Sequence, residues 1–356
     1  MLVLFCIIFA IADGCNYKQT TAKVNKTLNF GSKLVKKILN IIIKTVIPLL
    51  LGAVILYWIY RNFDFTSIAK ALDTMNMWWF WASCVFVVLS HVLRGWRWKL
   101  ALAPMGYNPN VSNCVYSVYI AYAANLVVPR IGEVSRCVVL ERYDKVPFAP
   151  SLGTLVSERL IDSLVVLLMT LTAITLQWNV FTEFLMEAGT VDTANAFSSV
   201  ERIAVMAVSA LAVIIALYLI LRKMSLWKKI KSFISRFWEG LTSLLRMKRA
   251  WLYVLETIGI WFCYFMQFYL CFFCFSFSSE LSFPAALLLF VAGSIAVVVP
   301  TPNGAGPWHF AIISIMMLYG VSSTDAGVFA LIVHTSQTLL VALLGIFGLI
   351  MLQFKR

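Results

Sequence analysis

The sequence has few charged residues and almost no histidine. Only 13% of its 356 residues are charged and three are histidine, whereas 61% are apolar. A soluble globular protein carries about twice that share of charge, so the composition excludes a soluble two-domain enzyme and a disordered chain. The net charge of +13 would fit a nucleic-acid-binding protein, but the basic residues cluster between long apolar runs, as in the loops of membrane proteins. We therefore expect an all-α polytopic membrane protein with no nucleic-acid partner.

The sequence also lacks the usual signatures of metals, cofactors and disulfide frameworks. The CxxC pair Cys271 and Cys274 lies inside an apolar run with no second pair or histidine beside it, so we expect no zinc or redox role. The three histidines are too dispersed to predict a metal triad. No nucleotide-binding loop and no hydrolase or metalloprotease motif occurs in a supporting context. We expect no metal, no cofactor and no catalytic residues.

Long apolar runs dominate the rest of the chain. A helix needs roughly 20 apolar residues to cross the hydrocarbon core, which predicts about eight spans, at 45–60, 78–93, 151–177, 202–221, 251–276, 284–299, 307–321 and 326–353. These spans form one integral membrane domain, 45–356, preceded by a basic arm, 1–44. The arm starts with a short apolar stretch, 1–15, for which a signal segment, an interfacial helix and an over-long gene start all stay open.

The distribution of basic residues predicts the orientation. Most Lys and Arg residues lie in the arm, in 94–150 and in 222–249, whereas 178–200 holds three acidic residues and no basic one. The positive-inside rule therefore predicts a multi-pass protein of the cell (inner or plasma) membrane with a cytoplasmic C-terminus. A further apolar run, 111–129, has basic flanks on both sides. We expect it to be a re-entrant helical hairpin that enters and leaves from the cytoplasmic side, beside a cavity.

Two Val-Val-Pro sequences interrupt apolar runs, and each is followed by glycine. Because proline and glycine do not continue a helix, both are predicted to be breaks at membrane depth. Paired broken helices in corresponding halves are typical of a transport site between inverted repeats, although coincidence in a valine-rich chain stays open. The break residues are Pro129 and Gly132 at the first position, and Pro300, Pro302, Gly304 and Gly306 at the second.

Polar side chains gather beside the first break and early in the predicted span 151–177. Arginine binds phosphate by planar two-point contacts, and groups three apart on a helix, such as Glu133 and Arg136, are expected to pair. The alternatives to a phosphate site are that these charges lie in loops and only set the membrane topology, or that they form structural ion pairs. Arg94 and Arg97 are expected to extend to lipid head groups as ordinary anchors. The candidate site residues are Asn125, Arg130, Glu133, Arg136, Arg159 and Asp162, with His309 beside the second break.

Four motifs in order suggest a family. They are Arg94-Gly95-Trp96-Arg97-Trp98, Pro129-Arg130-Ile131-Gly132-Glu133 with Arg136, Ser157-Glu158-Arg159-Leu160-Ile161-Asp162, and Pro300-Thr301-Pro302-Asn303-Gly304-Ala305-Gly306. Over about residues 85 to 353 the chain resembles the lysylphosphatidylglycerol synthase transmembrane-region family, also called flippase-like domain proteins.

The resemblance implies a membrane region that moves a lipid between leaflets. The best-known members add a cytosolic aminoacyltransferase domain, which we do not expect here because Arg356 follows directly after the last predicted span. Asn303 stands where glycine is usual, and Trp308-His309 where an acidic residue often follows, which leaves the identity of the lipid open.

The sequence thus predicts a lipid translocase that binds an anionic phospholipid or polyprenyl-phosphate head group in an intramembrane cavity. Arg130 and Arg136 are expected to hold the phosphate, with Arg159 next, while Glu133 and Asp162 orient the arginines. The alternatives are a membrane-embedded transferase acting on a lipid-linked substrate and a non-catalytic membrane subunit. Membrane lipids are the expected partners, and a homo-oligomer or a membrane partner protein stays open.

Overall fold

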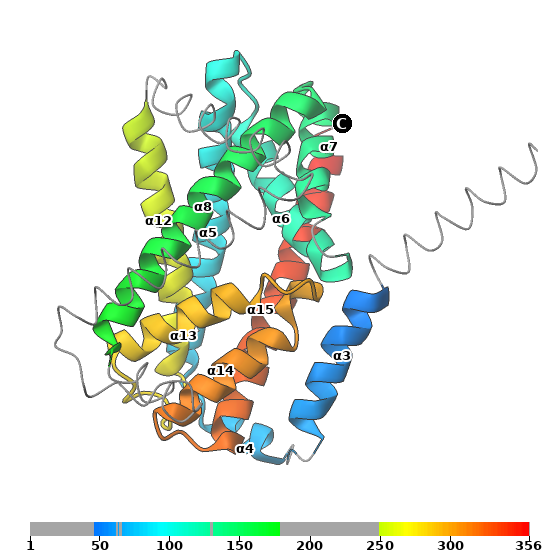
Figure 1. Ribbon diagram of the computed structural model, residues 1–356. Helices are drawn as coiled ribbons and strands as arrows, with labels where there is room; N and C mark the ends of the chain where they lie inside the picture. Colours follow the sequence, from blue (N-terminus) through cyan, green and yellow to red (C-terminus); the bar gives the residue numbers. More distant parts are fainter. Residues whose placement is uncertain (1–45, 62, 64–65, 129–130, 179–248, 356) are drawn as a thin grey trace, which may run out of the picture. The chain divides into compact units, whose positions relative to one another are not determined.

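The computed structural model of the protein describes residues 46–61, 63, 66–128, 131–178 and 249–355 (Figure 1). The chain divides into two units, 1–51 and 52–356, and every contact discussed below lies within the second. In the described ranges the structure contains ten α-helices and no strand. The expectation of an all-α chain is confirmed for this part of the protein.

Four helices are long and apolar enough to cross a membrane, and each coincides with a predicted span. They are α5 (Met77–Leu102), α8 (Phe148–Leu176), α12 (Ala250–Phe272) and α15 (Ser323–Gln353). α12 packs along α5, and α15 packs along α6 (Val111–Val127). Large apolar side chains such as Leu168 on α8 and Ile346 on α15 are more than half exposed, as expected for helices whose outer faces contact lipid tails.

The remaining apolar helices are shorter than the sequence predicted. α3 (Ile47–Tyr60), α6 and α13 (Phe283–Ala296) have 14, 17 and 14 residues, and α14 (Pro307–Leu318) has 12. At about 1.5 Å per residue, α13 and α14 are about 21 and 18 Å long, less than the ~30 Å hydrocarbon core.

The expected span 284–299 is shortened because the chain leaves the helix after Ala296, before it reaches Pro300, and the expected span 307–321 is shortened because α14 ends at Leu318. The predicted span 202–221 lies outside the described residues, as do the arm 1–44 and most of 178–249. α4 (Thr66–Thr74) is a short helix between α3 and α5.

α6 and α7 (Gly132–Asp144) form an antiparallel pair that we call hairpin A, residues 111–144. Its two ends meet where the Asp144 carboxylate accepts hydrogen bonds at 3.0 Å from the Asn110 backbone N–H and at 3.0 Å from Asn113 Nδ2. The expectation that 111–129 folds into a hairpin by itself is wrong, since α6 is continuous to Val127. Residues 111–128 contain no glycine or proline, so the helix continues to the end of this segment and α7 forms the second arm.

α13 and α14 form the second pair, hairpin B, residues 283–318. A single 3₁₀ turn, η3 (Pro302–Gly304), lies between them, and α14 begins directly at Pro307. Gly304 and Gly306 have φ values of 73° and 94°, a region that side chains other than glycine rarely adopt. The helix is interrupted at the second predicted position, between Ala296 and Pro307. At the first position α6 ends at Val127, and Pro129 itself lies outside the described residues.

The two hairpins open at opposite ends of α15. α15 begins only five residues after α14 ends at Leu318. At the other end of α15, Lys355 Nζ donates to Asn113 Oδ1 at 3.0 Å, beside the open end of hairpin A. α15 has 31 residues, so these ends are about 46 Å apart. The 3₁₀ turn of hairpin B contacts α6, so the hairpins meet between those ends.

Candidate functional site

Two arginines of α5 are buried beside a carboxylate of α8. Arg94 and Arg97 are 1% and 0% exposed. Asp162 lies between them, with Oδ2 at 3.0 Å from Arg94 Nη1 and Oδ1 at 2.9 Å from Arg97 Nη1. The expectation that these arginines extend to lipid head groups is therefore wrong. A guanidinium group inside a helical bundle is tolerated when a carboxylate pairs with it, and Asp162 provides that pairing.

A second set of ion pairs joins hairpin A to α8. Arg136 Nη1 lies 3.3 Å from Glu158 Oε2, and its guanidinium carbon lies 4.2 Å from the centre of the Trp98 ring. Glu133 instead contacts Arg159, with 3.5 Å between Glu133 Oε1 and Arg159 Nε. The expected pairing of Glu133 with Arg136 is wrong, because each side chain finds an opposite charge on α8.

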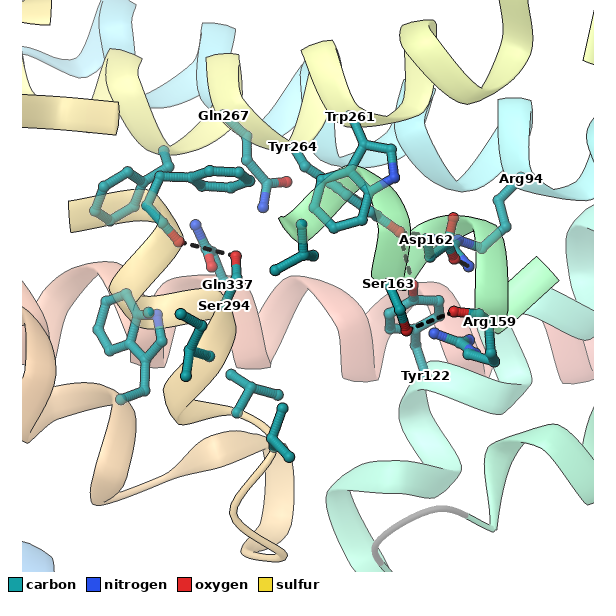
Figure 2. Close-up of a pocket in the computed structure, with 18 residues that line it drawn as sticks. Arg94, Tyr122, Arg159, Asp162, Ser163, Trp261, Tyr264, Gln267, Ser294 and Gln337 are labelled. Carbon is teal, nitrogen blue, oxygen red and sulfur yellow. Dashed lines mark hydrogen bonds and ion pairs between the residues drawn. The ribbon is translucent and has the colours of Figure 1, made fainter. Parts of the chain in front are cut away.

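A cavity of about 550 Å³ lies next to these ion pairs (Figure 2), within the size range of small-molecule sites. On one side it is lined by Arg94, Tyr122, Arg159 and Asp162. Arg94 Nε donates to the Tyr264 hydroxyl at 3.0 Å, and that hydroxyl lies 2.7 Å from the Tyr122 hydroxyl. Arg94 is thus fixed in place by the Asp162 carboxylate and by the Tyr264 hydroxyl, which Tyr122 contacts in turn.

Arg159 is the more available cation of the cavity. Its side chain is 45% exposed, and among the described residues its only ion pair is the 3.5 Å contact of Nε with Glu133. Its two terminal amino groups therefore remain open to a ligand. A guanidinium group in this state can make a two-point contact with a phosphate.

The other side of the cavity is contributed by hairpin B and by the facing helices. Phe290, Ile295 and Val297 give it an apolar wall. The amides of Gln267 on α12 and Gln337 on α15 lie there with the Ser294 hydroxyl, as Figure 2 shows, opposite the arginines. The cavity thus combines a cationic side with an apolar and hydrogen-bonding side.

The structure brings only part of the predicted site to this cavity. Arg159 and Asp162 line it, whereas Glu133 reaches it only through Arg159. Arg136 is 1% exposed and does not line the cavity. Asp162 contacts Arg94 and Arg97 rather than the arginines that it was expected to orient. Arg130 lies outside the described residues.

Asn125 and His309 lie in the turns of the hairpins. Asn125 Oδ1 accepts a hydrogen bond at 2.7 Å from the Gly132 backbone N–H, which closes the turn of hairpin A. His309 Nδ1 accepts a hydrogen bond at 3.4 Å from the Gly306 backbone N–H, and the His309 ring lies 4.6 Å from the His334 ring. His334 Nε2 is 3.1 Å from the Asn303 carbonyl oxygen. Neither Asn125 nor His309 lines the cavity described above.

Sequence reasoning missed several cavity residues, namely Arg94, Tyr122, Trp261, Tyr264 and Gln267. One signal was present in the spacing of polar side chains within an apolar run. An indole N–H, a phenol hydroxyl and an amide recur at intervals of three, at Trp261, Tyr264 and Gln267, which places them near one side of a helix. Within the described part of the chain, no three side chains of His, Cys, Asp or Glu are grouped to hold a metal ion.

Comparison with known proteins agrees with this architecture. One similar protein is the UPF0104 membrane protein MJ1595 of Methanocaldococcus jannaschii, 26% identical over 133 residues, which make up 36% of this chain and 40% of that protein. No solved structure matches the chain. The family described as lysylphosphatidylglycerol synthase TM region matches residues 45–345. The chain is therefore a multi-pass membrane protein that belongs to this family.

Proposed function

We propose that the protein moves an anionic lipid between the leaflets of its membrane and that the cavity binds the lipid head group. The observation that supports this most directly is the two-sided lining of the cavity, with guanidinium groups on one side and apolar residues of hairpin B on the other. A phospholipid or polyprenyl phosphate has the same two-sided chemistry. Its phosphate would lie at Arg159, and its chain would extend along Ile295 and Val297, each about half exposed.

The hairpins support a path across the membrane. Each arm of hairpin B is shorter than the hydrocarbon core, and the hairpins open at opposite ends of α15. We propose that both are re-entrant and form an inverted pair, as in transporters whose binding site lies between inverted repeats near the bilayer midplane. Broken backbone at that depth is tolerated where it is buried or lines a cavity.

The arginines have separate roles in this proposal. Arg159 contacts the phosphate directly because its terminal amino groups have no ion-pair partner among the described residues, and Arg94 adds positive charge from a fixed position. Arg136 is a positioning residue, since its contacts with Glu158 and Trp98 hold hairpin A against α8 and α5. Arg130 remains a candidate phosphate ligand on the basis of its sequence position alone.

The test is transbilayer movement of acyl-labelled phosphatidylglycerol in liposomes, followed by quenching of the label in the outer leaflet. Arg159→Gln should slow movement roughly tenfold or more, because a hydrogen bond to a charged group contributes about 1.5–3 kcal/mol. Arg142→Gln, an exposed position at the end of α7, is the matched control and should move lipid at the wild-type rate. A folded Arg159→Gln protein as fast as wild type, or a wild-type protein that moves no anionic lipid, would contradict the proposal.

A further inference from the structure

The phosphate site leaves one group of cavity side chains without a role. Trp261 Nε1 and Gln267 Oε1 are both buried and have no hydrogen-bond partner among the described residues. Most buried polar groups are hydrogen-bonded, and an unpaired one costs free energy. Both residues line the cavity, and a bound molecule that reached these covered atoms would supply the partners that they lack.

These groups lie on the same helix as Tyr264, which contacts the cationic side. Tyr264, whose hydroxyl accepts from Arg94, is three residues from Trp261 and three from Gln267 on α12. Three residues of helix correspond to a rise of about 4.5 Å. Figure 2 shows Gln267 on the side of the cavity opposite Arg94, with Trp261 between them. A head group whose phosphate contacts the arginines therefore extends its next atoms toward Trp261 and Gln267.

The missing partner has the chemistry of a hydroxyl group. A hydroxyl both donates and accepts, so separate hydroxyls of one polyol can accept from Trp261 Nε1 and donate to Gln267 Oε1, which lie six residues apart on α12. The amide of Gln337 and the hydroxyl of Ser294 line the same side and can bind a second hydroxyl. Four neutral hydrogen-bonding side chains beside a cationic site fit a phosphate that carries a polyol.

The charges of the cavity disfavour an ammonium group. Among the described lining residues Asp162 is the single carboxylate, and both of its oxygens are engaged by Arg94 and Arg97. An amine-bearing head group would find no free anion and would face two guanidinium groups. Like charges placed together in a weakly solvated site repel strongly.

Given the proposed translocation, on which this step rests, we infer that the cavity selects lipids whose phosphate is esterified to a polyol. It should prefer them to a bare phosphate monoester and to amine-bearing or aminoacylated phospholipids. Glycerol and a sugar-like ring share the required hydroxyl chemistry. Trp261 and Gln267 are the specificity-determining residues of this preference.

Selectivity of the wild-type protein is the first measurement. Acyl-labelled phosphatidylglycerol, phosphatidylinositol, phosphatidic acid and phosphatidylethanolamine are compared in liposomes of one composition. We expect the faster of the two polyol lipids to move roughly tenfold faster than phosphatidic acid or phosphatidylethanolamine, because one or two added hydrogen bonds contribute about that factor. Whichever polyol lipid is faster identifies the head group as a glycerol or a ring. If phosphatidic acid or phosphatidylethanolamine moves as fast as both polyol lipids, the inference is overturned.

Variants separate this inference from the proposed function. Gln267→Leu should abolish the preference, so that phosphatidylglycerol and phosphatidic acid move at the same rate, whereas Arg159→Gln should slow both lipids. Gln353→Leu, at the exposed end of α15, is the matched amide control. Gln267→Glu adds a carboxylate and should shift the preference toward phosphatidylethanolamine. If both Gln267 variants are folded, by their thermal midpoints, and keep the wild-type preference, the inference fails while the Arg159 result still stands.

Discussion

Hairpins A and B have similar backbones but differ in the charge of their side chains. Each consists of two short helices joined after a Val-Val-Pro sequence, with an asparagine at the turn. Hairpin A carries six charged residues, all in or after its turn, whereas hairpin B, residues 283–318, carries none. The second arm of hairpin A pairs with α8, while hairpin B presents Ile295 and Val297 to the cavity. The two-sided cavity therefore arises from side chains that differ on two similar backbones.

The turns also differ in what holds them. Hairpin A closes its own turn, because Asn125 of α6 accepts from the backbone of Gly132 at the start of α7. The turn of hairpin B is held from outside, since Asn303 Nδ2 donates to Thr338 Oγ1 at 2.9 Å and its carbonyl oxygen contacts His334. Both partners of Asn303 lie on α15. The turn of hairpin B thus depends on α15, whereas that of hairpin A is stabilised locally.

The strongest test of the two hairpins asks from which side of the membrane the open end of each one can be reached. If the hairpins are re-entrant from opposite sides, cysteines introduced at Tyr107 and Lys145, at the open end of hairpin A, should both label from the cytoplasmic side. Cysteines at Glu280 and Thr324, at the open end of hairpin B, should label only from the other side. The measurement is reaction with a membrane-impermeant maleimide in intact cells and in inverted vesicles, against the background of the native cysteines. If the cysteines at positions 107 and 145 label from opposite sides, hairpin A crosses the membrane and is not re-entrant.

The ion pairs beside hairpin A predict the largest effect on stability. Asp162→Asn leaves Arg94 and Arg97 buried without their shared carboxylate, and breaking a buried ion pair in this way costs about 3–5 kcal/mol. Thermal unfolding in a fixed detergent should show a much lower midpoint. Asp73→Asn makes the same chemical change at an exposed position of α4 and should leave the midpoint unchanged. Equal midpoints for the two variants would mean that the buried pairs do not stabilise the fold.

In each hairpin a glycine lies where the two helices approach closely, and alanine substitutions compare how tightly the two hairpins are packed. A Cβ on Gly132 would collide with the backbone carbonyl of Ala121 in α6, whereas a Cβ on Gly293 would lie 2.8 Å from Trp308 Nε1, part of a side chain. Because backbone yields less readily than a side chain, Gly132→Ala should destabilise by about 1–3 kcal/mol and Gly293→Ala by less.

The matched control for these variants is Gly153→Ala in α8. There a Cβ meets nothing within 4 Å, and alanine raises helix propensity by about 1 kcal/mol. Its midpoint should stay the same or rise. The measurement is the order of the unfolding midpoints of the three alanine variants. A Gly293→Ala protein less stable than the Gly132→Ala protein would contradict the conclusion that the helices of hairpin A approach each other more closely than those of hairpin B.

Local features of the sequence were sufficient to predict the helix breaks and the four long helices. Proline and glycine act on their own backbone, and an apolar run of sufficient length predicts a span without knowledge of its neighbours. Charges inside a span also pointed to the bundle interior, where Asp162 is buried, whereas the side chain of Arg159 is 45% exposed. These predictions required no information about which helices touch.

The pairing of charges was not predictable in the same way. Spacing of three on a helix favoured Glu133 with Arg136, but in the structure Arg136 contacts Glu158, 22 residues away, and Asp162 contacts Arg94, 68 residues away. Packing of α5, α7 and α8 decides these partners. The residues of α12 that complete the cavity are uncharged, so only their spacing of three within that apolar run distinguished Gln267 from a residue facing lipid.

The smallest loss of stability is expected for Asn303→Gly at the turn of hairpin B, where Asn303 has a φ of 52°. Asn303→Gly removes the hydrogen bond to Thr338 but suits the backbone, so it should cost about 0.5–1.5 kcal/mol. Asn303→Ala loses the same bond and adds about 1–2 kcal/mol for a left-handed conformation. The difference between their unfolding midpoints measures the backbone contribution alone. Because the lost side-chain bond ends on α15, Thr338→Ala should reproduce the glycine variant and add little to it, and full additivity would show that α15 does not hold this turn.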